Sequence, residues 1–531
     1  MNQPNVPQLR VEHARLATGA MVCTVDHLAT TAATTILSNG GSAADAAVAA
    51  SAVLAVTTQQ MCGMGGDLWA VVHQPGSTPT ALNSAGRAGS GSDPQALRQQ
   101  GHTQMPFRHH PASIPIPGCV DGWLALHNTH GRLPLGDVLG PAISLAETGF
   151  AVSPFLANAI PTVADVEGSH DYFIDGVPAR QGEMITRQGL ARSLRAIAAE
   201  GRDGWYGGEF GEGLIDVGQG IFTKQDLAQN QAEWVTPTSV EVWDHQLWTV
   251  PPPSQGYLTL AGASVANGLD LPADPNDPLW GHLIIESAKQ AAQDRIELLH
   301  ENADPAKLLA TDRLDRYRSA ISPTTAARIA GPGAGGGTIY LCVVDENRLA
   351  ISLMQSNAAG FGALVTVPSV GVFLQNRGAG FSLEPGHPAE LKGGCRPPST
   401  LCPALITNPD QSLRAVLGTM GGDGQPQVVL QMAARLLQAG QSPGEVMTAP
   451  RFTLTVPEPS GFNTWHHPQE LIVALEQGSS WSSGLTDKGH TVDERPWGLG
   501  LFGHAHLIDV DGPCLAGVAD PRAISGAAAG I

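Results

Sequence analysis

The stretch GAGGGTIYLCVVD, residues 333–345, decides how this chain is to be interpreted. A run of Gly and Ala ends at Thr338, and a β-strand pattern of Ile, Tyr, Leu and Val follows at once. If the bond between Gly337 and Thr338 were cut, Thr338 would become a new N-terminus. It would then carry a nucleophile, its hydroxyl, and a base, its own α-amine, on one residue. The alternative is an ordinary Thr at the start of a strand, where this residue is common.

The composition predicts a well-buried globular protein without a polyanionic or membrane partner. The chain has 531 residues, 42% of them hydrophobic and 15% charged, which predicts either two lobes or one large layered domain. The net charge of −19 and the lack of a Lys/Arg cluster argue against nucleic acid. The first residues lack the apolar core of a signal peptide, and no run approaches 18 apolar residues. Seven scattered Cys without a CxxC pair indicate reduced thiols, so we expect a cytoplasmic protein.

Helical and strand patterns are unevenly distributed along the chain. Residues 27–57 predict two helices, the second opened by a capping box at Ser42-Ala-Ala-Asp45. A glycine turn at 61–66 leads into a strand, Thr186–Glu200 is helical, and PPPSQGY (251–257) is a rigid turn before another helix. From Thr338 onward short strands dominate, interrupted by one clear helix, Gln425–Ala439. These strands are TIYLCVV, RLAISLMQ, GVFLQN, PALIT, LRAVLG and HAHLIDV. The pattern predicts packed α and β layers.

Three patterns that invite other functions have better structural explanations. GxGxxG occurs at Gly331/Gly333/Gly336 and at Gly498/Gly500/Gly503, and neither copy lies between a strand and a helix as a dinucleotide site requires. GQSPG (440–444) matches a nucleophile elbow, but Ser442, Pro443 and Glu445 are better explained as a helix cap. The His pairs at 109–110, 466–467 and 504/506 lack ligand spacing, so we predict no metal and no cofactor.

Separated motifs in the same order resemble the γ-glutamyltransferase family, a threonine-dependent branch of the N-terminal-nucleophile hydrolases. The motifs are GGSAADAAVAAS (40–51), GMGGDLW (63–69), PGCVDGW (117–123), TIYLCVVD (338–345), CRPPSTLCP (395–403), TMGGDGQPQ (419–427), APRF (449–452) and GVADPRAISGAAAG (517–530). The resemblance implies an α/β fold, a four-layer αββα sandwich of two stacked sheets between helices. It also implies self-cleavage between Gly337 and Thr338 into a large subunit, 1–337, and a small subunit, 338–531, with a dimer of such heterodimers as a possible assembly.

The resemblance also implies a set of site residues. Thr338 would be the nucleophile, and the backbone N–H groups of Gly421 and Gly422 would form the oxyanion hole. Arg87, with its bidentate guanidinium, would hold a substrate carboxylate together with the hydroxyls of Ser399 and Thr400. Asn357 corresponds to an Asn near the nucleophile. A second Thr that is usual two residues earlier is replaced here by Gln355.

One segment departs from the family. Where family members carry an acidic ligand for a substrate amino group, this chain reads QNRGAGF (375–381), with Arg377 and Gly380 and no carboxylate. Arg377 would oppose an ammonium and favour a neutral or anionic group, unless it is a solvated surface charge. The lid loop after this segment is also short. These departures resemble a lid-less branch that includes oxamate amidohydrolases and glutaryl-cephalosporin acylases.

The sequence therefore predicts a self-processing threonine amidohydrolase. Its expected substrate is an amide of a small carboxylate-bearing acid, oxamate-like or glutaryl-amide-like, cleaved through an acyl-enzyme. One alternative is a true γ-glutamyl hydrolase or transpeptidase that acts on glutathione-like donors. The other is a non-catalytic homologue that serves as a binding protein, against which the intact Thr338, Gly421, Gly422 and Arg87 argue.

Overall fold

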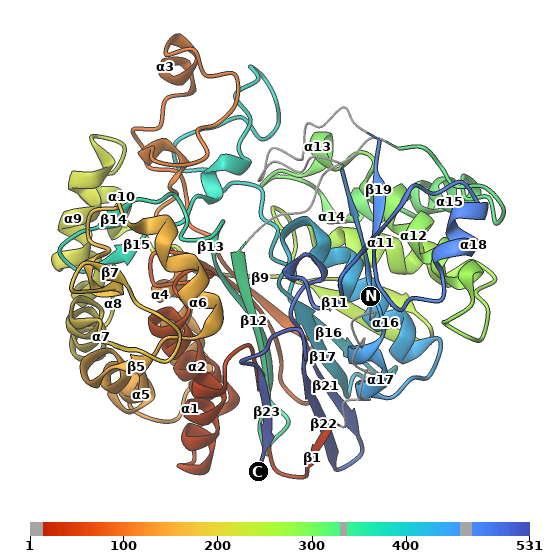
Figure 1. The fold of residues 1–531 in the computed structure, drawn as a ribbon, viewed down its shortest axis with the longest axis horizontal. Coiled ribbons are helices and arrows are strands. Elements are labelled where there is room, and N and C mark those ends of the chain that lie inside the picture. The colour runs from red at the N-terminus through yellow and green to blue at the C-terminus, as the bar shows by residue number, and fades with distance from the viewer. Residues whose placement is uncertain (1–13, 330–336, 457–469) are drawn as a thin grey trace, which may run out of the picture.

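Two antiparallel sheets lie face to face in a computed structural model that describes residues 14–329, 337–456 and 470–531 (Figure 1). Within these residues each of the two sheets has seven strands. The first contains, in order, β23 (Ala527–Gly530), β2 (Met21–Thr24), β12 (Gly337–Val344), β13 (Ala350–Ala358), β3 (Asp67–His73), β4 (Thr80–Ser84) and β9 (Glu233–Val235). The second contains β1 (Arg15–Ala17), β22 (Cys514–Ala519), β21 (Ala505–Asp511), β17 (Leu413–Thr419), β16 (Ala404–Thr407), β11 (His245–Thr249) and β10 (Thr238–Val242).

Helices cover the outer face of each sheet. The first sheet is covered by α1 (His27–Ser38), α2 (Ala43–Thr57) and α4 (Cys119–His130), with α5 (Leu135–Thr148) packed on α2 and α7 (Gln188–Glu200) packed on α5. The second is covered by α11 (Tyr257–Asn267), α12 (Pro278–Ala292) and α16 (Gln425–Leu437). The result is a four-layer αββα sandwich, which confirms the predicted fold class.

Shorter elements complete the chain. The helices are α3 (Pro94–Gln99), α6 (Pro154–Ala159), α8 (Arg202–Tyr206), α9 (Glu209–Gly218), α10 (Lys224–Ala228), α13 (Arg295–Leu298), α14 (Pro305–Leu308), α15 (Thr311–Ser319), α17 (Pro443–Thr448) and α18 (Ser482–Asp487). The strands are β5 (Phe150–Ala151), β6 (Phe173–Ile174), β7 (Val177–Pro178), β8 (Met184–Ile185), β14 (Thr366–Val367), β15 (Val372–Phe373), β18 (Phe452–Thr455), β19 (Ile472–Glu476) and β20 (Val492–Arg495).

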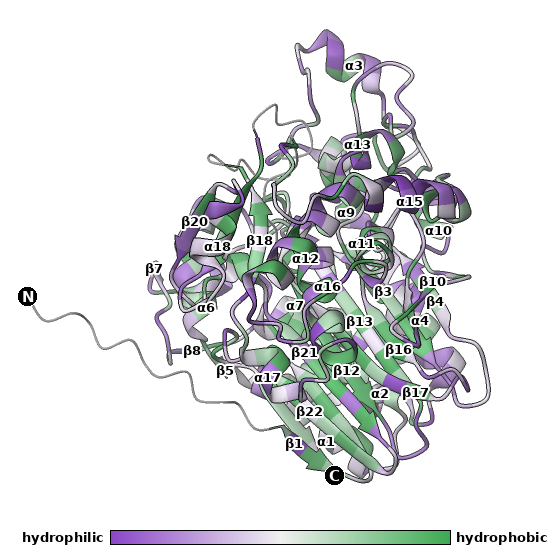
Figure 2. Cartoon of the chain, turned by 90° about the vertical axis from the view of Figure 1, so that its right-hand side faces the viewer, coloured by the Kyte–Doolittle hydropathy of each residue, from purple (hydrophilic) through white to green (hydrophobic). Residues whose placement is uncertain are grey.

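Strand β12 is buried on both faces, which explains its unbroken apolar sequence. Alternate residues, Ile339, Leu341 and Val343, pack toward the helices, in the same cluster as α2. The others, Tyr340, Cys342 and Val344, pack between the two sheets. Figure 2 shows the same distribution: the strands are largely green, whereas an outer helix such as α15 is largely purple. Thr338 therefore stands near the start of a strand that is packed on both faces.

Local signals predicted the element ends well. The capping box at Ser42 and Asp45 begins α2 as expected. Ser442 and Glu445 form another at α17, which confirms the cap explanation of GQSPG. Both predicted helices are present. The one predicted at 186–200 begins two residues later, at Gln188, and the one predicted at 425–439 ends two residues earlier, at Leu437. The one clear helix predicted after Thr338 is α16, and the short helices α17, which the cap at Ser442 indicated, and α18 follow it.

The segments before and after Thr338 share both sheets. Strand β12 lies between β2 and β13, and the second sheet combines β1, β10 and β11 with four strands from beyond Thr338. Of the two predicted organisations, the chain adopts the layered domain. Gly331/Gly333/Gly336 fall outside the described residues, and Gly498/Gly500/Gly503 lie in a loop that leads into strand β21. No helix in the described ranges is long and apolar enough to cross a bilayer.

Candidate active site

Three neighbouring strands present polar side chains at one end of the first sheet. Thr338 stands second in β12, and its side chain is buried, at 1% exposure. On the adjacent strand β13, the Ser356 hydroxyl lies 3.0 Å from the Thr338 hydroxyl. On the next strand, β3, Asp67 is the register partner of Ser356. Because cross-strand partners share a face of a sheet, these three side chains point to the space between the two sheets.

Ser356 connects the Thr338 hydroxyl to the preceding carbonyl. Its Oγ donates to the carbonyl oxygen of Gly337 at 2.5 Å and accepts from the amide of Ala358 at 2.8 Å. A serine hydroxyl has only one proton. If that proton lies toward Gly337, the Thr338 hydroxyl must donate to Ser356. The arrangement therefore polarises the Gly337–Thr338 peptide carbonyl and leaves lone pairs on the Thr338 oxygen free.

Ser356 was not among the residues that the sequence singled out, and its neighbours were. Gln355, predicted as a substrate-binding residue, lies on the opposite face of the sheet, where it pairs with Ile339 and accepts a hydrogen bond from Ser51 of α2. Asn357 lies at a register irregularity, and its amide donates to the backbone of Gln59 at 2.9 Å. The motif spacing pointed to residues 355 and 357. In the structure Tyr340 pairs with Met354, and the next residues on the same face of the two strands are Thr338 and Ser356.

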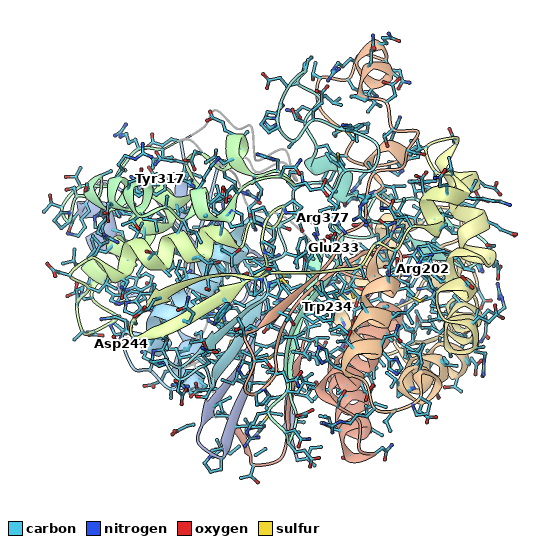
Figure 3. All side chains as sticks on the ribbon, turned by 180° about the vertical axis from the view of Figure 1, so that it is seen from behind. Arg202, Glu233, Trp234, Asp244, Tyr317 and Arg377 are labelled. Carbon is cyan, nitrogen blue, oxygen red and sulfur yellow. The ribbon has the colours of Figure 1, made fainter. Side chains whose placement is uncertain are left out.

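Arg377 is a buried partner of Asp67, not a solvated surface charge. Its side chain is 2% exposed, and its Nε donates to Asp67 Oδ2 at 2.9 Å. Its Nη1 donates to the hydroxyl of Thr400 at 2.9 Å. Burial raises the pKa of Asp67, although the Arg377 charge opposes this rise. Figure 3 shows Arg377 near the middle of the molecule, on the short turn Arg377–Gly380.

The segment that carries Ser399 and Thr400 runs beside the end of β13. The amide of Cys402 contacts the sulfur of Met354, two residues before Ser356, at 3.2 Å. Ser399 accepts from the amide of Leu401 at 3.3 Å, and both Ser399 and Thr400 are fully buried. The structure thus brings Thr338, Ser356, Asp67, Arg377 and Thr400 to one end of the sheet.

The two glycines predicted to bind an oxyanion follow strand β17. Gly421 has φ of 134° and Gly422 has φ of 55°, backbone conformations that favour glycine. A 3₁₀ turn at Gly422–Gly424 then opens helix α16. Strand β17 crosses β12 closely, since a Cβ on Gly418 would lie 2.5 Å from the ring of Tyr340. The turn is therefore adjacent to the sheet end that carries Thr338.

Arg87 belongs to a separate charged cluster. Its guanidinium donates to the carbonyl of Asn230 at 3.3 Å and to Glu233 at 3.4 Å, while Thr400 is bonded to Arg377. Arg396 also binds Glu233, at 2.8 Å. Desolvation and the neighbouring Arg396 charge lower the pKa of Arg87. Glu233, visible in Figure 3, therefore holds two guanidinium groups at once.

A pocket of about 540 Å³ is lined in part by residues 379–385, which follow Arg377 in the chain. Gly380 and Pro398, which precedes Ser399, form part of its wall, with apolar Phe381 and Leu299. His102 and His387 add polar groups to the rim. Gly380 lies in this wall, and a Cβ there would come within 2.9 Å of the carbonyl oxygen of Pro398.

One group of described residues has the spacing of metal ligands, His282, Glu286 and His490. The ammonium of Lys289 already lies in it, 3.0 Å from Glu286 and 3.2 Å from His490. Burial lowers the pKa of His282 and lowers that of His490 to about 3, the Lys289 charge adding to the second shift. Hydrogen bonds within the group and to Ser322 and Ala327 explain it as a structural network.

Comparisons with known proteins show the family and the fold. A family model described as gamma-glutamyltranspeptidase matches residues 29–530. The oxamate amidohydrolase proenzyme of Klebsiella pneumoniae subsp. pneumoniae is 33% identical over 97% of this chain and 99% of that protein. The glutathione hydrolase-like YwrD proenzyme of Bacillus subtilis is 32% identical over the same shares. The crystal structure of a cephalosporin acylase from Bacillus halodurans superposes with a TM-score of 0.89 at 30% identity, covering 100% of this chain and 99% of the other.

Proposed function

The chain belongs to the gamma-glutamyltranspeptidase family of amidohydrolases and acyltransferases, and from that premise we propose that it is a self-processing threonine hydrolase for the amide of a small carboxylate-bearing acid. One observation carries the proposal. The Thr338 hydroxyl, the Ser356 hydroxyl and the Gly337 carbonyl form a single hydrogen-bonded line in the uncut chain. The relatives named as proenzymes support it.

Self-cleavage begins with the attack of Thr338 Oγ on the carbonyl carbon of Gly337. The new C–O bond moves the carbonyl π pair to oxygen, where the Ser356 hydroxyl donates. Collapse of this intermediate breaks the C–N bond, and the hydroxyl proton passes to the departing nitrogen. Water then hydrolyses the Gly337–Thr338 ester. The products are a large subunit, 1–337, that ends in a carboxylate and a small subunit, 338–531, that begins with a free Thr338 amine.

The free amine converts Thr338 into a catalyst for other amides. An α-amine has a reference pKa of about 7.7–8.0, so part of it is neutral near pH 7.5 and can take the hydroxyl proton. Oγ attacks the substrate carbonyl, the Gly421 and Gly422 amides receive the oxyanion, and the amine leaves with the proton. Water repeats the sequence on the acyl ester and releases the acid. Asn357 follows Ser356 in β13, and we keep the proposal that it lies near the nucleophile.

The charges around Thr338 favour a substrate whose acyl part lacks an α-amino group. Arg377 provides a buried guanidinium where other family members carry an acid, and Asp67 orients it. Although Asp67 balances its charge, the Arg377 guanidinium presents only hydrogen-bond donors, which oppose a substrate ammonium and suit a carbonyl or carboxylate. Thr400 and Ser399 add hydroxyl groups to the same wall, and Arg87, from the separate cluster with Glu233, is the proposed second cation for the substrate carboxylate. Oxamate-like and glutaryl-amide-like substrates fit this requirement, in agreement with the named activity of the Klebsiella relative.

A panel of three amides tests the proposal: oxamate, a glutaryl anilide and a γ-glutamyl anilide. We expect the self-cleaved wild type to release ammonia or amine from the first or second at least tenfold faster than from the γ-glutamyl compound. Tenfold corresponds to about 1.4 kcal/mol, which is less than an unfavourable charge contact costs. Faster γ-glutamyl turnover would instead support the hydrolase or transpeptidase alternative. A protein that cleaves itself and hydrolyses none of the three would contradict the substrate assignment.

A paired substitution assigns the specificity to Arg377. The double variant Asp67→Asn with Arg377→Gln removes both charges of the buried pair, so neither is left alone. We expect about a 10- to 100-fold loss of kcat/KM for the preferred anionic amide and a smaller loss for the γ-glutamyl one. The matched control is Arg414→Gln with Asp509→Asn, an ion pair between β17 and β21, which should change neither value by more than about twofold.

A further inference from the structure

A buried carboxylate directly follows the two oxyanion glycines. Asp423 lies next to Gly422 in the 3₁₀ turn, and its side chain is 1% exposed. Its Oδ1 lies 2.7 Å from Nη2 of Arg295, whose side chain is also 1% exposed. Arg295 begins the short helix α13, in the part of the chain before Thr338. The pair therefore joins the proposed large subunit to the turn that the proposed small subunit contributes.

An uncompensated Asp423 would work against the chemistry. The Gly421 and Gly422 amides stabilise negative charge on a substrate oxygen, and a carboxylate in the same turn, out of contact with water, would repel that charge. Because Asp423 and Arg295 are both buried, the electrostatic attraction between them is only weakly screened by salt. Arg295 removes the repulsion by neutralising Asp423. Arg295 also fixes the position of the turn, because the glycine backbone of the turn is flexible by itself.

A second side chain from the same part of the chain supports the turn. The Gln255 amide nitrogen donates to the carbonyl of Gly422 at 3.0 Å and to the carbonyl of Thr400 at 2.9 Å. Within the turn, the amide of Gly424 donates to the carbonyl of Gly421 at 3.0 Å. Gln255 thus ties the oxyanion turn to the segment that carries the substrate-binding hydroxyls. Both supports come from residues before Thr338, and the turn itself comes from residues after it.

We infer that Arg295 is a positioning residue of the acyl-transfer reaction, which neutralises Asp423 and holds the oxyanion turn in its working geometry. The inference rests on the proposed function, because it assumes that Gly421 and Gly422 stabilise an oxyanion formed at Thr338. This role predicts a result that a purely structural ion pair does not give. Removal of Arg295 alone lowers activity, and the further removal of the Asp423 charge restores it.

The experiment compares Arg295→Met, Asp423→Asn, the double variant and a matched control. The control is Arg313→Met in helix α15, which removes a guanidinium from a partly buried pair with Asp294, 2.7 Å away. Self-cleavage is read on a denaturing gel. Acylation of Thr338 is read from the p-nitrophenolate burst with mono-p-nitrophenyl glutarate, and kcat and KM are measured with the best amide of the panel.

We expect Arg295→Met to lower the burst rate and kcat by about 100-fold with KM within about threefold, as for loss of one oxyanion donor. Asp423→Asn should stay within about fivefold of wild type, and the double variant should recover at least tenfold over Arg295→Met, a strong coupling. If Arg295→Met fails to cleave itself while the double variant cleaves, the charge compensation is again supported.

Two results would overturn the inference: a double variant as slow as Arg295→Met, or an Arg313→Met control that is equally impaired. The readouts also separate it from the proposed function. A wild type that gives a burst with the ester but hydrolyses no amide contradicts the proposed function, and the burst rates of the variants still decide the role of Arg295. A wild type without any burst contradicts both.

Discussion

At the scale of single residues, the site depends on which side chain faces Thr338. Ser356 takes that place because the β12–β13 ladder pairs Tyr340 with Met354, and one step further along the same face leads to Ser356. Gln355 points to α2 instead. The hydroxyl beside the nucleophile could not be identified from motif spacing, because a single step of register exchanges the two faces of a strand.

Replacement of Ser356 tests its role in self-cleavage. We expect Ser356→Ala to slow cleavage by about 100-fold, because the Gly337 carbonyl loses its donor, and Ser356→Thr to retain most of the rate. The rate is followed on a denaturing gel during refolding from urea. Ser352→Ala is the matched control, since Ser352 lies on the same face of β13 and its hydroxyl bonds the Tyr340 hydroxyl. Equal rates for Ser356→Ala and wild type would exclude this role.

At the scale of elements, the features encoded by local sequence were predicted better than the pairing of distant strands. The helix caps and the strand after Thr338 are encoded within a few residues, and they were predictable. Strand β23 was not, because Ala527–Gly530 has a poor strand propensity and is extended only through its pairing with β2. The Asp67–Arg377 contact joins residues 310 positions apart, and no local pattern indicates it.

The glycine turn before β3 positions β13 and can be tested separately. A Cβ on Gly66 would lie 2.1 Å from the backbone oxygen of Ser356. We expect Gly66→Ala to displace Ser356, to destabilise the fold by about 1–3 kcal/mol as overpacking does, and to abolish efficient self-cleavage. The control Gly136→Ala has nothing within 4 Å and lies in helix α5, so it should cleave normally. Normal cleavage by Gly66→Ala, seen on a gel, would contradict the expected displacement.

At the scale of the whole molecule, the two parts of the chain are interleaved and would remain together after cleavage. The segment before the junction is held by the second part: the amide of Ala326 donates to the carbonyl of Lys488, and the amide of Leu471 donates to the carbonyl of Ile329. The network of His282, Glu286, Lys289 and His490 anchors the same segment. The family resemblance predicted the layers, whereas these anchors follow only from the three-dimensional contacts.

The His490 network predicts how stability depends on pH. Burial and the Lys289 charge lower the pKa of His490 to about 3, with His282 and Lys488 adding to the effect and Glu286 facing it at 3.8 Å. Because the pKa of His490 is lower in the folded protein than in the unfolded chain, where it is about 6.5, the folded state is favoured fully above pH 6.5. This contribution to the free energy of unfolding is lost as the pH falls from 6.5 toward 3. Each such His contributes a slope of about 1.4 kcal/mol per pH unit in that window.

This slope can be measured by urea unfolding between pH 6.5 and 4.5, in the uncut Thr338→Ala background so that unfolding is intramolecular. His490→Gln should show a shallower dependence than its parent by about one proton's slope. His170→Gln, at an exposed His on the surface, should leave the slope unchanged. Identical slopes for His490→Gln and its parent would rule out the neutral, buried His490.

The central claim is that Thr338 cuts the chain before itself, and a denaturing gel with N-terminal sequencing tests it most directly. Wild type and Thr338→Ser should each yield two fragments, the smaller beginning at residue 338. Thr338→Ala should run as one chain of 55.2 kDa, because its side chain has no nucleophile. A wild type that stays intact, or a Thr338→Ala variant that is cut at the same bond, would contradict the account.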